Sequence, residues 1–212
     1  MAGIRQIKVG PMENFAYLVA DEVAKEALLV DPGWDAPILL KALEQEGWQL
    51  KAIALTHNHF DHVNATADIL RAHDIPIYTH GADAGGLAAS WRSSLRDVAE
   101  PGKCRIGTVE IGFLHTPGHT PGSMCLSVAG NLITGDTLFI GGCGRVDLPG
   151  SDPQQMYETL RRIAGLDGSL CVLPGHDYGS TVTATLASEK HANPYLKFAT
   201  SGTLGQFLHA VG

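Results

Sequence analysis

The chain has 212 residues, of which 44% are hydrophobic, and this suffices for the buried core of one domain spanning 1–212. The formal net charge of −7 and the lack of a basic stripe argue against a nucleic-acid partner. No apolar stretch approaches the ~20 residues of a membrane span, and Met1–Gly10 lacks a secretory pattern, so we expect a cytoplasmic protein that contacts no membrane.

The four cysteines are widely spaced and form no CxxC pair. This pattern predicts neither a disulfide framework nor a structural zinc site. We therefore expect Cys104, Cys125, Cys143 and Cys171 to be small buried packing residues.

Short apolar runs, helical spacing and turn residues define the elements of the N-terminal part. In chain order they are strands at 4–9, 15–20 and 27–30, a helix at 36–46, a strand at 50–55, a helix near 63–73 and a short strand at 76–79. Gly47 supplies the stop signal of the first helix. Strands therefore precede helices and then alternate with them.

The C-terminal part continues with sheet and helix. Its predicted elements are strands at 108–112, 124–128 and 131–134, a helix from Pro153 to about Ala164, a strand at 171–173, a helix within 181–191 and a C-terminal helix ending near His209. Asp152 before Pro153 is a typical helix cap. The whole pattern predicts an α/β protein in which helices cover mixed sheets.

The most informative segment follows the strand at 50–55 and reads Thr-His-Asn-His-Phe-Asp-His from Thr56. His57, His59, Asp61 and His62 are four possible ligands within six residues. Imidazole nitrogen and carboxylate oxygen suit zinc, iron or manganese. A lone histidine is more often a surface or hydrogen-bonded residue, but a cluster at this density predicts a metal site.

Three further segments place candidate ligands after predicted strands. His119 stands in a loop stiffened by prolines and turned by glycines, Asp136 follows the strand at 131–134, and His176 follows the strand at 171–173. The two oxygens of Asp136 can bridge a pair of cations. Because each segment follows a strand, we expect these ligands to meet at one sheet edge.

The HxHxDH motif at 57–62, His119 in its TPGHTPGS loop, the Gly135-Asp136 pair and His176 together resemble the metal motifs of the metallo-β-lactamase superfamily. The resemblance implies an αβ/βα four-layer sandwich and two divalent metal ions, zinc first and iron or manganese as alternatives. It places one metal on His57, His59 and His119, and the other on Asp61, His62 and His176, with Asp136 as the bridge. Asp31, in Val-Asp-Pro-Gly, is implied to support the ligand loops.

This resemblance implies a hydrolase in which two metals activate a hydroxide and Asp61 orients it or accepts its proton. The segment Gly135–Arg145 points to one branch of the superfamily, because its Gly-Cys-Gly-Arg turn is similar to that of glyoxalase II. By that likeness Arg145 and Tyr178 are substrate-binding candidates for the glutathione part of a thioester. A guanidinium suits a carboxylate, although Arg145 can instead pair with Asp147.

Two other functions stay open. A glutathione-persulfide dioxygenase shares the Gly-Cys-Gly-Arg-x-Asp turn and the His-Asp-Tyr segment, and would use one iron held by His57, His119 and Asp136. Phe60, at a position where that group has a small residue, and Asp31-Pro32-Gly33 favour the hydrolase. A non-catalytic, metal-stabilised binding protein would have no need of seven ligands.

Overall fold

The N-terminal part of the chain forms the first of two six-stranded sheets. The structure is a computed structural model that describes residues 1–211. In spatial order the strands of this sheet are β1 (Ala2–Val9), β2 (Asn14–Asp21), β3 (Glu26–Val30), β4 (Gln49–Ala54), β5 (Ile77–Thr79) and β6 (Leu95–Asp97). The pairs β1–β2 and β2–β3 are antiparallel, and the neighbours from β3 to β6 are parallel.

The second sheet has the spatial order β14-β13-β10-β9-β8-β7. Its strands are β7 (Gly102–Ile106), β8 (Val109–His115), β9 (Met124–Val128), β10 (Asn131–Gly135), β13 (Cys171–Pro174) and β14 (Ala184–Thr185). Only the pair β10–β13 is parallel within this described sheet. A small hairpin, β11 (Leu138–Phe139) and β12 (Gly142–Cys143), leaves β10 toward the site described below.

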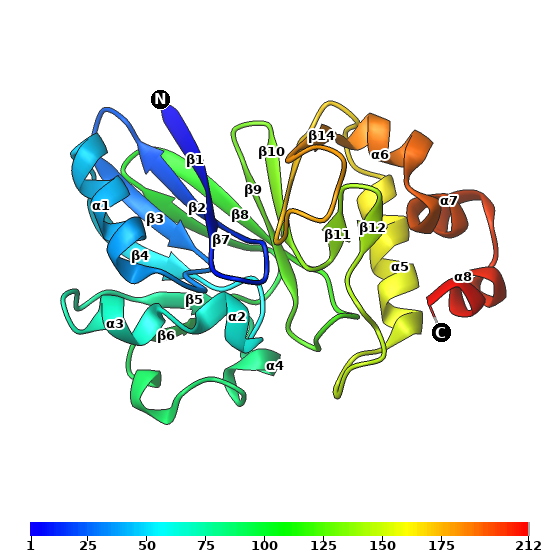
Figure 1. The fold of residues 1–212 in the computed structure, drawn as a ribbon, viewed down its shortest axis with the longest axis horizontal. Coiled ribbons are helices and arrows are strands. Elements are labelled where there is room, and N and C mark those ends of the chain that lie inside the picture. Colours follow the sequence, from blue (N-terminus) through cyan, green and yellow to red (C-terminus); the bar gives the residue numbers. More distant parts are fainter. Residues whose placement is uncertain (212) are drawn as a thin grey trace.

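Helices cover the outer faces of both sheets (Figure 1). They are α1 (Ala36–Glu46), α2 (Phe60–Val63), α3 (Thr66–Leu70), α4 (Gly81–Ala84), the 3-10 turn η1 (Ala89–Trp91), α5 (Pro153–Ala164), α6 (Leu186–Ala192), α7 (Pro194–Ser201) and α8 (Leu204–Val211). Figure 1 shows α1 outside the first sheet and α5, α7 and α8 outside the second.

Three apolar clusters separate these four layers. Successive side chains of a strand point to opposite faces, so one strand can feed two clusters. In β2, Leu18 packs toward the helices of the first sheet and Tyr17 packs between the sheets. In β10, Ile133 packs between the sheets and Leu132 packs toward α5. The α/β prediction and the αβ/βα sandwich implied by the resemblance are therefore confirmed.

Local signals set the bounds of the two longest helices. Helix α1 spans the predicted 36–46, and Gly47 ends it with φ of 66°, a left-handed conformation that glycine adopts at little cost. Asp152 caps α5 by accepting hydrogen bonds from the backbone N–H groups of Gln154 and Gln155. One face of α5, including Leu160, is buried against the second sheet.

The predicted helix near 63–73 is wrong in its extent. The structure has two short helices instead, α2 and α3, because the N–H group of Ala65 donates to the carbonyl of Pro32, 2.9 Å away, rather than within a helix. This contact bends the chain after the ligand segment. Helix α2 also starts earlier than predicted, at Phe60.

The C-terminal helices also differ from the prediction. The predicted helix within 181–191 starts only at Leu186, because Ala184 and Thr185 pair with β13 and the Thr185 hydroxyl caps the helix. The single helix predicted to end near His209 is divided at Gly202 into α7 and α8. Strands β6 and β7 were not predicted.

Among the described residues, none of the helices has the length and apolar character needed to cross a membrane. The prediction of one domain over 1–212 stays a prediction. The predicted ligand segments follow β4 of the first sheet and β8, β10 and β13 of the second. The prediction that the ligands meet at the edge of one sheet is therefore wrong, because the segments come from strands of both sheets.

Candidate metal centre

The loop after β4 carries four of the predicted ligands into the interior. His57 and His59 stand between β4 and α2, whereas Asp61 and His62 belong to the single turn of α2. His57 and His62 are each 1% exposed, and Asp61 is 6% exposed. Ionisable groups buried this closely need partners of opposite charge or a bound cation.

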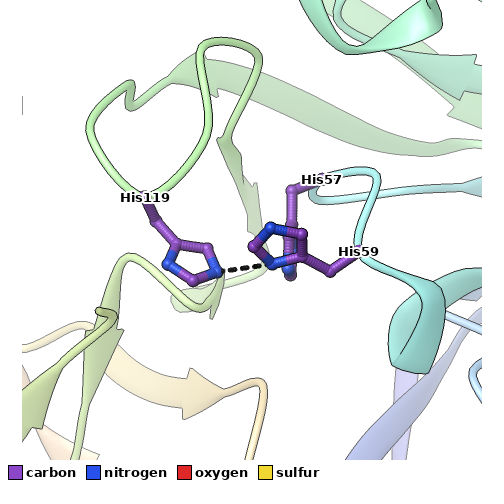
Figure 2. Close-up of side chains that lie close together, drawn as sticks. All are labelled: His57, His59 and His119. Carbon is purple, nitrogen blue, oxygen red and sulfur yellow. Dashed lines mark hydrogen bonds between the residues drawn. The ribbon is translucent and has the colours of Figure 1, made fainter. Parts of the chain in front are cut away.

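His57, His59 and His119 form a first cluster of possible ligands. One ligand atom from each lies within 4.8 Å of the others. Figure 2 shows His119 reaching from its loop toward the two histidines, and its Nε2 lies 2.9 Å from Nδ1 of His59. Nε2 of His57 is buried and has no hydrogen-bond partner in the described structure. A cation bound here would satisfy that nitrogen, so the cluster fits a metal.

Asp61, His62 and His176 form a second cluster of the same kind. Nε2 of His62 lies 3.1 Å from Nε2 of His176, and Oδ2 of Asp61 lies 3.4 Å from the same His176 nitrogen. The Asn14 amide donates to Asp61 Oδ2 over 2.8 Å and so holds the carboxylate in place.

Asp136 lies between the two clusters. Its Oδ1 is 3.3 Å from Nε2 of His62, and its Oδ2 is 3.5 Å from Nε2 of His119 and 3.4 Å from Nε2 of His176. Oδ1 is buried without a hydrogen-bond partner in the described structure. The carboxylate therefore faces ligands of both clusters, which is the placement that a bridging ligand requires.

Backbone carbonyls fix which nitrogen of two imidazoles faces the centre. Nδ1 of His119 lies 2.7 Å from the carbonyl oxygen of Arg145, and Nδ1 of His176 lies 2.8 Å from that of Met12. A carbonyl oxygen only accepts, so each Nδ1–H donates. The Nε2 atoms consequently point at the centre. Metal-binding histidines are commonly oriented in this way, by a hydrogen bond from the other ring nitrogen.

Asp31 performs the same task for the loop after β4. Its carboxylate accepts hydrogen bonds from the N–H and hydroxyl groups of Thr56, at 2.7 and 2.6 Å, and from Nδ1 of His62 at 3.0 Å. Since the Thr56 hydroxyl gives its hydrogen to Asp31, it accepts from Nδ1 of His57, 3.0 Å away. Asp31 thus supports the ligand loop, as the resemblance implied, and leaves both Nε2 atoms to the centre.

The electrostatics of the centre suit cations. Burial alone would raise the pKa of Asp136, but the charges and hydrogen bonds of His62 and His176 hold it well below its ordinary value. Burial likewise opposes ionisation of Asp61, yet His176 and His62 lower its pKa to about 2. Burial lowers the pKa of His57 well below its ordinary value. Against the effect of burial, the carboxylates raise the pKa of His62 well above its ordinary value and that of His176 to about 9. At neutral pH the carboxylates are therefore ionised and His57 is neutral, whereas His62 and His176 carry protons that a bound cation would replace.

The sequence did not point to two residues that organise this centre. Asn14, at the start of β2, holds Asp61, and Asp83, in α4, is fully buried behind the ligand loops. The Asp83 carboxylate accepts from the N–H group of Asn58 and from the Thr120 hydroxyl, which adjoin the histidines of the first cluster. The tertiary structure brings these residues to the ligands. No local motif marks them, so the sequence alone could not identify them.

A cavity of about 400 Å³ opens above the two clusters, and both predicted substrate-binding residues line it. Arg145 forms a double hydrogen bond with Asp147, at 2.9 and 2.8 Å, so the ion pair considered from the sequence is present. The ring of Tyr178 stacks on His176 at 4.5 Å. Burial raises the pKa of the Cys143 thiol to about 12, so it is not an activated nucleophile.

His115 shares the sequence loop of His119 but lies away from the centre. Its ring stacks on that of His80 at 3.8 Å, and its Nε2 lies 2.9 Å from the carbonyl oxygen of Pro121.

Comparison with known sequences gives a consistent picture. The model of the Metallo-beta-lactamase superfamily matches residues 9–176. A hydroxyacylglutathione hydrolase of Anaeromyxobacter dehalogenans is 40% identical over 169 residues, which are 79% of this chain and 63% of that protein. The probable polyketide biosynthesis zinc-dependent hydrolase PksB of Bacillus subtilis is 32% identical over 169 residues, 79% of this chain and 75% of that protein.

Solved structures share the fold over nearly the whole chain. ETHE1 from Myxococcus xanthus superposes with a TM-score of 0.85 at 27% identity, covering 99% of this chain and 89% of that one. TTHA1623 in a di-iron-bound form gives a TM-score of 0.77 at 33% identity, covering 90% of this chain and 99% of that one.

Proposed function

This chain belongs to the metallo-beta-lactamase superfamily, and on that premise we propose that it is a metal-dependent thioester hydrolase acting on S-acylglutathione-type substrates. The resemblance drawn from the motifs is confirmed at the level of the superfamily and of its hydroxyacylglutathione hydrolase relatives. The match covers 63% of the length of the hydroxyacylglutathione hydrolase of Anaeromyxobacter dehalogenans, so the substrate of that enzyme comes to this chain only as a proposal.

The observation that carries the proposal is the convergence of seven side chains on one centre, of which five line the cavity, namely His59, Asp61, His119, Asp136 and His176. His57, His59 and His119 would hold one divalent cation, Asp61, His62 and His176 a second, and Asp136 would contact both. When bound, such cations would polarise a carbonyl group and lower the pKa of water from 15.7 toward about 7.

The residues of the chain supply the remaining requirements. Asn14 orients the Asp61 carboxylate, so Asp61 can align the attacking water as a hydrogen-bond acceptor. Within the described lining of the cavity there is neither a serine nor a cysteine to serve as a nucleophile. The leaving group of a thioester is a thiolate, whose conjugate thiol has a pKa near ~8.5, so it can leave with little help from a general acid. This suits a cavity to which no separate general acid is assigned.

Arg145 and Tyr178 would position the thiol part of the substrate. Both line the cavity beside His176 and His119. The Arg145–Asp147 pair is exposed, and water weakens exposed pairs, so a substrate carboxylate can exchange for Asp147.

The direct test is reconstitution of metal-free protein with zinc, iron or manganese, followed by metal analysis and a hydrolysis assay with S-lactoylglutathione and simple acylglutathiones. We expect up to two cations per chain and turnover that depends on them. Protein that holds two cations and hydrolyses no thioester contradicts the proposal. Retained metal without turnover of thioesters, esters or persulfides would favour a metal-stabilised binding protein.

A persulfide dioxygenase is the second candidate, and the likeness to the ETHE1 structure supports it. It would use His57, His119 and Asp136 around a single iron. Zinc has no redox chemistry, so zinc-loaded protein must lose any oxygen uptake on glutathione persulfide but can retain thioester hydrolysis. Oxygen uptake with iron and no hydrolysis with any metal would establish the second candidate instead.

A further inference from the structure

Apart from the metal ligands and Arg145, the wall of the cavity is formed by apolar and aromatic side chains. We propose that the site selects thioesters with an apolar acyl group, which packs on Phe60 and Met12; this rests on the proposed thioester hydrolysis. Apart from metal ligands and Arg145, the lining residues are Met12, Phe60, Phe139, Leu148, Pro149 and Tyr178.

Apolar residues of the cavity wall are exposed to solvent, which indicates that the wall is a binding surface for a ligand. Phe60 and Met12 are 61% and 37% exposed although their side chains are apolar, and Tyr178, which would contact the thiol part, is 56% exposed beside them. Scattered exposed apolar residues are ordinary, but several around one cavity mark a binding surface. A ligand that covers them removes apolar area from water and is stabilised for that reason.

Phe60 lies next to the metal ligand Asp61 and packs on Trp34. Its ring meets the ring of Trp34 edge to face, at 6.1 Å and 88°. Trp34 in turn donates from Nε1 to Oδ1 of Asn14 over 3.1 Å, and the same Asn14 holds Asp61. Phe60 and the ligand Asp61 are thus connected through Trp34 and Asn14, so an acyl chain that packs on Phe60 lies close to the metal ligands.

The charges beside the cavity are paired with one another. Arg145 pairs with Asp147, and Lys8 pairs with both Glu13 and Asp177. An alkyl group needs no polar partner, whereas Met12, Phe60 and Phe139 offer none to a charged or hydroxylated acyl group. The thiol carrier can still use Arg145, because the exposed pair with Asp147 leaves a substrate carboxylate able to exchange for Asp147.

The expected effect follows from apolar burial. A fully buried methylene is worth about 0.8 kcal/mol, which is about fourfold in kcat/KM. Because the wall is partly open to solvent, we expect about twofold per methylene. Lengthening the acyl group from acetyl to hexanoyl should then raise kcat/KM by roughly tenfold or more.

The experiment uses zinc-loaded protein and thioesters of two carriers, glutathione and N-acetylcysteamine, with acetyl, lactoyl, butanoyl and hexanoyl groups. The corresponding S-methyl and S-hexyl thioethers, which cannot be hydrolysed, measure binding by calorimetry. Phe60→Ala should remove most of the chain-length preference. Ile38→Ala, which truncates an apolar side chain 51% exposed on α1 outside the cavity lining, should retain it.

Equal affinity for the methyl and hexyl thioethers on both carriers overturns the inference, and so does an unchanged preference in Phe60→Ala. Tighter binding of the hexyl thioethers without hydrolysis of any thioester would support the apolar wall and count against the proposed function. The two failures are therefore distinguishable.

Discussion

Replacing Asp83 should loosen the ligand loops although this residue touches no predicted metal ligand side chain. Its carboxylate is fully buried and accepts three hydrogen bonds, from the N–H of Asn58 at 3.1 Å, the hydroxyl of Thr120 at 2.7 Å and the N–H of Gly122 at 2.7 Å. The first donor lies between His57 and His59 in sequence, and the second adjoins His119. Asp83 therefore ties together the two loops that form the first cluster.

The magnitude follows from the donors left without an acceptor. Each buried unsatisfied donor costs about 1–3 kcal/mol, and partial relaxation lowers the sum, so Asp83→Ala should cost about 3–5 kcal/mol of unfolding free energy. Asp83→Asn keeps the shape and one acceptor but sets an amide NH₂ against a donor, so about 1–3 kcal/mol is expected. Cation affinity of the first cluster should fall by about 10–100-fold, as for other supports of metal ligands.

The assays are denaturant unfolding of metal-free protein and cation titration against a chromophoric chelator. Cobalt spectra can separate the two clusters, and we expect the cluster of Asp61, His62 and His176 to change less. Asp68→Ala, which removes an exposed ion pair with Arg71 on α3, is the matched control and should change neither quantity. Unaltered stability together with unaltered cation affinity in Asp83→Ala would refute the reasoning.

Three further outcomes are expected. Asp136→Ala should lower the cation content and abolish turnover while thermal melting still shows a folded protein, and full activity would exclude a bridging role. Arg145→Ala should raise KM for glutathione thioesters about tenfold with little change in kcat, because a charge-assisted contact to the carrier is lost; an unchanged KM would remove it from the site. Hydrogen bonds from the Thr108 hydroxyl and N–H lower the pKa of Asp21, so its contribution to stability is complete above its ordinary pKa of 3.8 and is lost as the pH falls further. Asp21→Asn should accordingly flatten the pH dependence of unfolding below about pH 5, and an unchanged slope would contradict this.

The sequence alone was sufficient where a local signal had a local cause. The bounds of α1 follow from the spacing of Leu39 and Leu43 and from the left-handed Gly47, and α5 follows from the Asp152 cap. The ligand segments were visible for the same reason, since several metal-binding residue types stand within a few positions of each other. These features depend on neighbours in the chain.

Features that depend on distant partners were decided by the tertiary structure. Strand β6 is short and forms because it pairs with β5, and α2 ends where Ala65 bonds to Pro32 rather than within a helix. Asp83 and the cavity wall that includes Phe60 likewise gain their roles from segments that are far away in sequence. A buried acceptor such as the Asp83 carboxylate, or an exposed ring such as that of Phe60, has no signature in the sequence, because its free energy is set by which groups the fold places beside it.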